Sequence, residues 1–404
     1  MNLTTRIGQL ARLRQAAQNI RASYWFIPAC LVVSAMLVAW FAHLGDRVVG
    51  VDLPLPDALN AMTTGDAKDL MSTIASAMIG VAGVMFSLTL VAVTHAAGQY
   101  GPRLIGNFMR DRGNQWSLGI LLGIFVYALL TLALVSGKAE EVARLSVALG
   151  LAFSLVGVGT MIFFIHHVPE TVNVANITSG LGRRLATMVR QQIDDAGDET
   201  SPVARDGEPD VRLSFPWTGY IQAVSYDRLR ELAEEHDFAL RFAATPGDFV
   251  TPNVPFLEIW GDPPDEDLVE EIMGTVAVGP EQTETQAMTF IADQLVEMVA
   301  LALSPGINDP FTAINCLNWI TAALEDALTY EGGLKGEGEG RIVGVEMTFE
   351  ELYAHTYPAA LPYIADDAMA RQAAIERLDR LMRVETTRPR DLILRDLRRL
   401  RALP

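Results

Sequence analysis

Four long apolar segments dominate the first 170 residues of the chain. They cover about Tyr24–Leu44, Leu70–Ala96, Trp116–Val135 and Val142–Ile165, and Arg144 is the only charged residue within them. A helix needs about 20 residues to cross a hydrocarbon core that is about 30 Å thick. The pattern therefore predicts four transmembrane helices and disfavours four buried helices of a soluble protein.

After residue 170 the apolar positions become periodic, and helix-like and strand-like spacings alternate. Strands are predicted at Val211–Phe215, Tyr220–Val224, Phe238–Phe242 and Phe256–Trp260. Helices are predicted at 171–195, Tyr226–His236, Glu266–Met273, Gln286–Leu303 and Phe311–Leu328. The expected fold is a polytopic α-helical membrane protein, with a four-helix transmembrane domain followed by an α+β cytoplasmic domain.

This reading divides the chain into five parts. They are a basic cytoplasmic segment at 1–23, the four-span domain at 24–170, a helical linker at 171–210, a small β-rich module at 211–262, and a helical cytoplasmic domain with a basic C-terminal helix at 263–404.

The distribution of charge supports the division between a membrane part and a C-terminal part, and it predicts the orientation of the spans in the membrane. The net charge is −18, yet residues 1–170 hold 11 Lys/Arg and 9 Asp/Glu, whereas residues 171–404 hold 20 and 40. Arginines flank the first span on its N-terminal side and fill the connection between spans two and three, while the other two connections are acidic. Because Lys and Arg gather on the cytoplasmic side, both termini are expected in the cytoplasm and the protein in the inner membrane.

Composition excludes several other classes of protein. An acidic soluble part repels nucleic acid, and two cysteines, Cys30 in the first span and Cys316 in the soluble part, do not form a disulfide scaffold. The sequence contains no nucleotide-binding loop, no Cys-x-x-Cys and no catalytic triad order, and we detect no internal repeat. It therefore predicts no cofactor and gives no support for an enzyme.

The second span carries a stripe of small and hydroxyl side chains at three-, four- and seven-residue steps: Ser72, Ser76, Gly80, Gly83, Ser87 and Thr94. One interpretation is a polar lining for a permeation path. The other is a tight seam between helices, which small residues favour in lipid. The seam is favoured, since a path for charged solutes usually carries an ionisable group.

Histidines end the fourth span, in the sequence His166-His167-Val-Pro-Glu170. On a continuous helix His166 and Glu170 would share a face, so His166, His167 and Glu170 are candidate metal ligands. Interfacial histidines bonded to nearby groups are the preferred interpretation, because two ligands do not make a site.

Two further segments of the soluble part have a functional and a structural interpretation. The loop Ser304-Pro305-Gly306-Ile307-Asn308-Asp309-Pro310 is a candidate ligand site together with Asp293 or Glu297, but a cap of the next helix explains the same residues and is preferred. The arginine- and leucine-rich C-terminus, residues 388–404, predicts a basic amphipathic helix that binds anionic lipid or a neighbouring subunit. A docked terminal helix is an equal alternative.

The sequence resembles a bacterial family of predicted membrane proteins, the domain of unknown function 2254. The resemblance rests on long segments: Gly83-Val-Met-Phe-Ser-Leu-Thr-Leu90, Gly101-Pro-Arg-Leu104, Asn107-Phe-Met-Arg-Asp-Arg-Gly-Asn-Gln115, Phe164-Ile-His-His167, Thr245-Pro-Gly-Asp-Phe249 and Ala302-Leu-Ser-Pro-Gly-Ile-Asn-Asp-Pro-Phe-Thr-Ala313. The resemblance implies a membrane bundle with a cytoplasmic domain, and it implies no activity and no site residues.

The leading hypothesis is a homo-oligomeric channel or transporter of a small ion or solute, gated by its cytoplasmic domain. The alternative is a non-transporting membrane scaffold or envelope-stress sensor. Expected partners are the lipid bilayer, further copies of the chain and a cytoplasmic protein, with no nucleic acid.

Overall fold

The structure is a computed structural model that describes residues 24–48, 61–101, 103, 111–135, 143–195, 208–283, 286–329, 341–343, 347–386 and 390–403. The described residues form two compact units. One comprises 24–98 and 103–173, and the other comprises 99–101 and 174–403.

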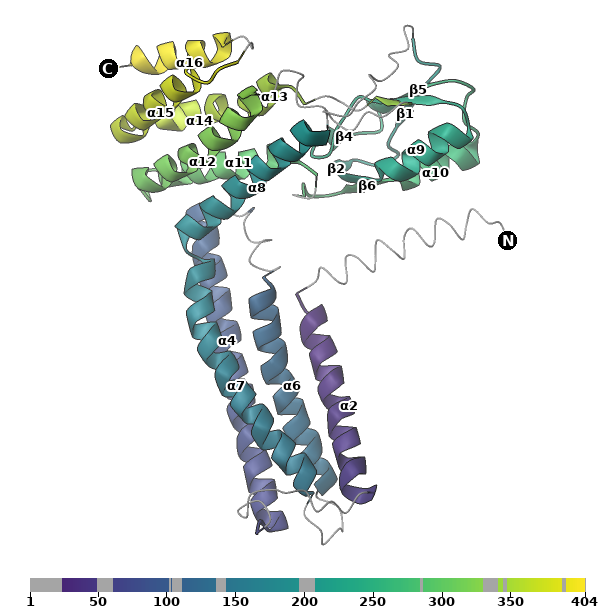
Figure 1. Ribbon diagram of the computed structural model, residues 1–404, viewed down its shortest axis with the longest axis vertical. Helices are drawn as coiled ribbons and strands as arrows, with labels where there is room; N and C mark the ends of the chain where they lie inside the picture. Colours follow the sequence, from purple (N-terminus) through teal and green to yellow (C-terminus); the bar gives the residue numbers. More distant parts are fainter. Residues whose placement is uncertain are drawn as a thin grey trace. The chain divides into compact units, whose positions relative to one another are not determined.

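The first unit is a helical bundle (Figure 1). Its helices are α2 (Phe26–Val48), α4 (Thr64–Tyr100), α6 (Arg112–Val135) and α7 (Arg144–Thr171). All four are long and apolar enough to cross a membrane, and they are the described helices that meet this criterion. Each predicted span thus coincides with one of these helices, and the chain is a mostly helical protein with four candidate membrane spans.

Helices α2 and α6 approach each other closely. A Cβ placed on Gly119 of α6 would lie 2.9 Å from Cα of Pro28 in α2, and one on Gly123 would lie 3.4 Å from the carbonyl oxygen of Leu31. Two glycines four residues apart thus let the two backbones touch, which is a common packing device of membrane helices.

Helix α4 packs on α6 and α7 by different means. Met71, Met78 and Met85, at seven-residue steps, are buried in the core of the bundle. Met71 covers Gly150 and Met78 covers Gly157, both on α7. Long flexible thioethers therefore fill the space above two glycines of the neighbouring helix.

The second unit begins with α8 (Val174–Asp195) and contains a module of two sheets and two helices, the β module. Its elements are β1 (Val211–Ser214), β2 (Gly219–Val224), α9 (Tyr226–Glu235), β3 (Ala239–Phe242), β4 (Phe249–Val250), β5 (Pro255–Trp260), α10 (Glu266–Gly274) and β6 (Val276–Gly279). One sheet has the order β1-β5-β3-β7, where β7 is Ile342–Val343, and the other has the order β4-β2-β6. One core joins both sheets and includes Leu268, Ile272 and Val276, so the module extends beyond residue 262, where the sequence placed its end.

The β module is built from two equivalent halves. Each half reads strand, strand, helix, strand: β1-β2-α9-β3 and β4-β5-α10-β6. The pairs between the halves correspond, because β1 pairs with β5 as β4 pairs with β2, and β2 pairs with β6 as β5 pairs with β3. The register agrees as well, since Ser214 lies opposite Pro255 in one sheet and Val250 lies opposite Gly219 in the other.

This arrangement corrects the expectation of no internal repeat. The two halves are related at a spacing of 36 residues between β1 and β4, and the sequences share little beyond apolar alternation and a proline in each first turn, Pro216 and Pro252. The equivalence is carried by strand pairing, which a single sequence does not display.

A layer of helices completes the second unit (Figure 1). Its members after the β module are α11 (Met288–Ala302), α12 (Pro310–Thr329), α13 (Phe349–Ala354), α14 (Tyr357–Ile364), α15 (Ala368–Leu381) and α16 (Asp391–Arg401). Helix α8 packs against α11 and α12, and α15 packs against α12 and α16. The predicted strands and helices of this half are observed within a few residues, whereas β4, β6, β7, α13, α14 and α15 were not predicted.

Candidate functional site

The stripe of the second span lies on an exposed face of α4. All six of its residues are exposed in the chain: Ser72, Ser76, Gly80, Gly83, Ser87 and Thr94. No described atom comes within 4 Å of a Cβ placed on Gly80 or Gly83. The stripe is therefore not a seam between described helices of one chain, and we call it the small face of α4.

The small face and the methionine face of α4 point in opposite directions. Met71, Met78 and Met85 are nearly inaccessible, and the helical turn of 100° per residue places the stripe across the helix from them. Larger apolar side chains flank the stripe, and Val84 and Val91 are 60% and 64% exposed. Between Asp69 and His95 the helix carries no ionisable side chain.

Hydroxyl groups on the small face bond to their own helix. Ser87 Oγ donates to the Gly83 carbonyl at 3.0 Å, and Thr94 Oγ1 donates to the Leu90 carbonyl at 2.6 Å. Because their hydrogen bonds are made within the helix, these hydroxyls do not require a polar group on a neighbouring helix.

A polar contact holds the start of α7. The Asp46 carboxylate at the end of α2 accepts hydrogen bonds from Leu145 N (2.9 Å), Ser146 N (3.1 Å) and Ser146 Oγ (2.6 Å). The helix has no cap of its own, because Ala143 occupies the cap position. Asp46 therefore caps α7 from another helix, and Tyr127 OH donates to the Ser146 carbonyl at 2.8 Å beside it.

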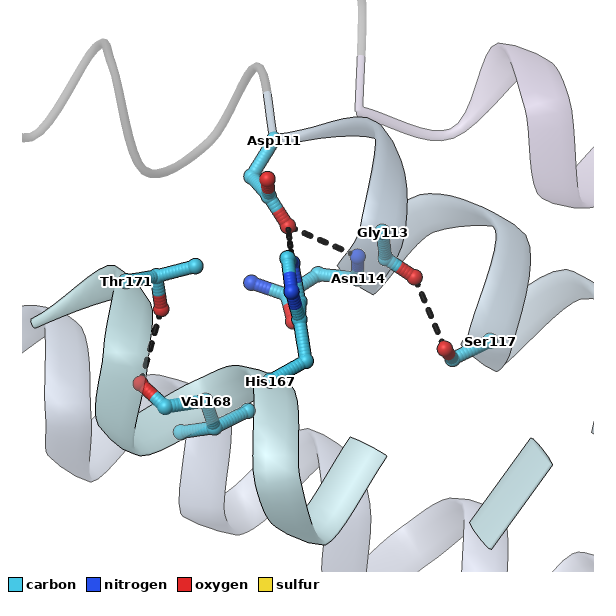
Figure 2. A network of polar contacts seen from close by, with 7 residues as sticks. All are labelled: Asp111, Gly113, Asn114, Ser117, His167, Val168 and Thr171. Atoms are coloured by element: carbon cyan, nitrogen blue, oxygen red, sulfur yellow. Dashed lines mark hydrogen bonds and ion pairs between the residues drawn. The ribbon is translucent and has the colours of Figure 1, made fainter. Parts of the chain in front are cut away.

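A second polar contact joins the start of α6 to the end of α7 (Figure 2). Asp111 Oδ2 accepts from Asn114 N at 2.8 Å and lies 2.9 Å from His167 Nε2. A Cβ on Gly113 would lie 2.2 Å from that nitrogen, so only glycine lets the imidazole reach the carboxylate. Two segments that carried the family resemblance, around 107–115 and 164–167, thus meet through these side chains.

The structure brings two of the candidate metal ligands together and directs the third elsewhere. His166 Nε2 lies 3.3 Å from Glu170 Oε1, and both side chains are exposed. His167 turns to Asp111 and stacks on Phe163. No group of three or more His, Cys, Asp or Glu side chains suited to a metal occurs within the part of the chain that the structure describes.

The loop before α12 is organised by its own backbone. Asp309 Oδ1 accepts from Phe311 N and Thr312 N, and Asp309 Oδ2 accepts from Thr312 Oγ1 at 2.5 Å. Asn308 adopts φ +50°, a left-handed conformation that asparagine tolerates. Ser304 accepts from Asn308 N through its carbonyl, while Pro305 and Gly306 are exposed. Asp309 thus has the position and bonds of a helix cap.

The acidic residues proposed to join that loop have contacts outside it. Asp293 Oδ1 is 2.8 Å from His355 Nδ1, at the end of α13. Glu297 lies against Gly101, where a Cβ would be 2.8 Å from its carboxyl carbon. The hydrogen bond that the His355 imidazolium donates to Asp293 raises the pKa of His355, and partial burial opposes this effect. The charges of Asp293, Asp248 and Glu351 also raise this pKa.

The basic C-terminal helix α16 is docked. Ile393, Leu397 and Leu400 are buried, and α16 packs on α15. Asp396 is 2% exposed and accepts from Tyr353 OH at 3.1 Å. Burial and the nearby Asp396 raise the pKa of Tyr353. The apolar face is therefore covered, and the exposed face carries Arg395, Arg398, Arg399 and Arg401.

Comparison with known proteins identifies relatives without a known activity. A family described as "Predicted membrane protein (DUF2254)" matches residues 21–380. The chain is similar to uncharacterised proteins of Mycobacterium bovis and of two strains of Mycobacterium tuberculosis, each 28% identical over 271 residues. Each match covers 64% of this chain and 52% of the relative, so the chain spans about half the length of the curated relatives it matches. No solved structure matches it significantly.

Proposed function

Since the chain belongs to the DUF2254 family of predicted membrane proteins and the relatives it matches are uncharacterised, we propose a function from its geometry. Copies of the chain associate in the bilayer through the small face of α4. The resulting homo-oligomer is a channel or transporter for a small ion or solute, and the C-terminal unit controls it.

The observation that carries the proposal is the exposure of the small face. A stripe of six small residues facing lipid would leave a shallow groove among the large side chains beside it, such as Val84 and Val91. Small residues at four-residue spacing allow another helix to approach closely. The methionine face already binds the rest of the bundle, so the small face is the side available to a second copy.

A path along the axis of the oligomer follows from the same residues. Helices that meet at a symmetry axis through glycine and serine would surround that axis with small and hydroxyl groups instead of leucine and phenylalanine. With no ionisable side chain between Asp69 and His95, the path would suit a small hydrated solute without strong charge selection.

Control by the C-terminal unit is supported by the end of α4. Residues 99–101 at this end belong to the same compact unit as residues 174–403, and Gly101 lies against Glu297 of α11. A change in the C-terminal unit would therefore act on the helix that carries the small face. By the Lys/Arg distribution we assign this unit, and both termini, to the cytoplasm and the protein to the inner membrane.

The second candidate function is a non-transporting scaffold or envelope-stress sensor. It is supported by the hydroxyls of Ser87 and Thr94, which bond to carbonyls of their own helix and so allow two small faces to pack dry. In that case the oligomer contains no path, and the C-terminal unit binds a protein partner.

Flux into proteoliposomes, measured with potassium, sodium, chloride and proton reporters, tests the first function. Gly80→Leu and Ser87→Leu are expected to change the flux, whereas Val158→Leu, on an exposed apolar position of α7, is the matched control. Light scattering in detergent gives the oligomeric state. An oligomer that is silent to all four ions supports the scaffold, and a chain that remains monomeric at high concentration in lipid refutes both.

A further inference from the structure

The two equivalent halves of the β module differ at one sheet edge. In the first half β7 pairs in parallel with β3. In the second half β6 is the last strand of its sheet, and no described strand lies on its outer edge. The same half-module therefore has an added strand in one place and an open edge in the other.

The strands β3 and β6 are equivalent residue by residue. Phe242 of β3 lies opposite Leu257, and Val278 of β6 lies opposite Ile221, so these pairs correspond at a spacing of 36 residues; beyond Ile221 the register of β2 shifts by one residue. Leu240 and Val276 are both buried in the common core, at 0% and 6% exposure. The outer edges of β3 and β6 therefore correspond.

Strand β7 shows which kind of segment pairs with the outer edge of β3. Leu240 N donates to the carbonyl of Arg341 at 2.8 Å, and the neighbouring Ile342 is 1% exposed. The Arg341 guanidinium pairs with Asp237 at 2.5 Å, just after the end of α9. The added segment thus consists of a basic residue followed by β-branched apolar residues.

The backbone of β6 presents the same groups to its open edge. The Gln286 side chain bonds both Val224 N and the Val224 carbonyl, so these groups point away from β6. Residues opposite one another in an antiparallel pair face the same way relative to the ladder. Val276 therefore directs its amide away from β2, as Leu240 does away from β5, and Val278 follows two residues later.

Space and charge at this edge suit a basic segment. No described atom lies within 4 Å of a Cβ placed on Gly274, the last residue of α10. Helix α10 contains four acidic residues and no basic residue, and Glu270 and Glu281 are exposed. The negative end of the helix dipole adds to these charges.

We propose that the outer edge of β6 binds an extended segment of a partner protein, which adds to the sheet in parallel as β7 adds to β3. The segment carries a basic residue followed by two β-branched apolar residues. Backbone pairing supplies the affinity, and the carboxylates near α10 select the basic residue. This surface would serve the protein under either function proposed above.

The test uses the full chain in detergent and a peptide probe, acetyl-Gly-Arg-Ile-Val-Gly-Val-amide, which has the sequence of residues 340–345. Amide hydrogen exchange of Val276 and Val278, whose amides point to the open edge, and fluorescence anisotropy of a labelled peptide are measured together. We expect fast exchange in the free chain, at least tenfold slowing with saturating peptide, and at least tenfold weaker binding when the peptide Arg is replaced by Glu.

Two variants separate edge pairing from other binding. Val278→Pro removes an outward amide at an edge position where proline is tolerated. This variant should abolish the slowing of amide exchange by the peptide. Val278→Ala keeps the backbone amide, so the peptide should still slow amide exchange at this edge. A peptide N-methylated at alternate amides tests the same point without altering the protein, and it should not bind.

Three results would overturn the proposal. Slow exchange of the Val276 and Val278 amides in the free chain would mean that the edge is already covered. Protection that depends on protein concentration without peptide would mean that copies of the chain cover it. Equal binding to Val278→Pro or of the N-methylated peptide would mean that the peptide binds elsewhere.

Discussion

Replacement of Gly119 by alanine should destabilise the bundle at the contact between α2 and α6. A Cβ at this position would lie 2.9 Å from Cα of Pro28 and 2.7 Å from Cδ1 of Leu31. The leucine methyl can rotate away, but the proline Cα belongs to the backbone. Carbon atoms prefer a separation of about 3.5–4.0 Å, so the two helices must move apart by about 0.6–1 Å.

The expected effect combines two opposing contributions. Overpacking of this kind costs about 1–3 kcal/mol, and alanine stabilises a helix by about 1 kcal/mol relative to glycine. Gly159→Ala on α7 is the matched control, because no described atom lies within 4 Å of its Cβ position and only the second contribution applies. The two variants should therefore differ by about 1–3 kcal/mol, or about 5- to 150-fold in the unfolding equilibrium.

Reversible unfolding in mixed micelles of dodecylmaltoside and SDS measures this difference. Tryptophan fluorescence is a suitable signal, since Trp25 and Trp40 flank or lie in α2 and Trp116 lies in α6. If Gly119→Ala proves as stable as Gly159→Ala, the close contact of α2 and α6 is wrong.

Three further outcomes are expected. Asp46→Ala should lower the stability of the bundle by about 0.5–2 kcal/mol in the same unfolding assay, because it removes the cap of α7, whereas Asp46→Asn should retain most of it. The raised pKa of His355 means that its bond to Asp293 contributes fully below the ordinary histidine pKa and is lost as the pH rises through the folded value, so the melting temperature of the wild type should fall over that range more than that of Asp293→Asn. Burial raises the pKa of the Cys316 thiol to about 12, so maleimide at pH 8 should leave Cys316 unmodified in native protein and reach it only after unfolding.

The four apolar helices and most elements of the second unit follow from the sequence because their signals are local. An uncharged run of about 20 residues has one stable solution in a bilayer, and alternating positions such as those of Phe256–Trp260 favour a half-buried strand. Asp309 illustrates the same point at the level of one residue, since the cap interpretation needs only its neighbours.

Contacts between residues far apart in the sequence could not be predicted from the sequence. The spacing of the stripe from Ser72 to Thr94 predicts one helical face, but which helix faces it is a tertiary property, and the seam inside the chain uses Gly119 and Gly123 instead. His167 was paired in sequence with His166 and Glu170, whereas in the fold it meets Asp111. The signal that would have found this contact is the Asp-x-Gly-Asn sequence at a helix start, which provides a carboxylate beside a position without a side chain.

The strand pairing of the β module also determines how this part of the chain can fold. Among the six strands of its two halves, all four pairings join one half to the other. A nascent chain that ends before β4 therefore has no sheet partner for its first three strands, and β3 gains β7 only after α11 and α12 have been made. Formation of such distant contacts is slow. During synthesis the strands of the first half would therefore have no strand partner until the second half is made, and the module should then fold in one cooperative step.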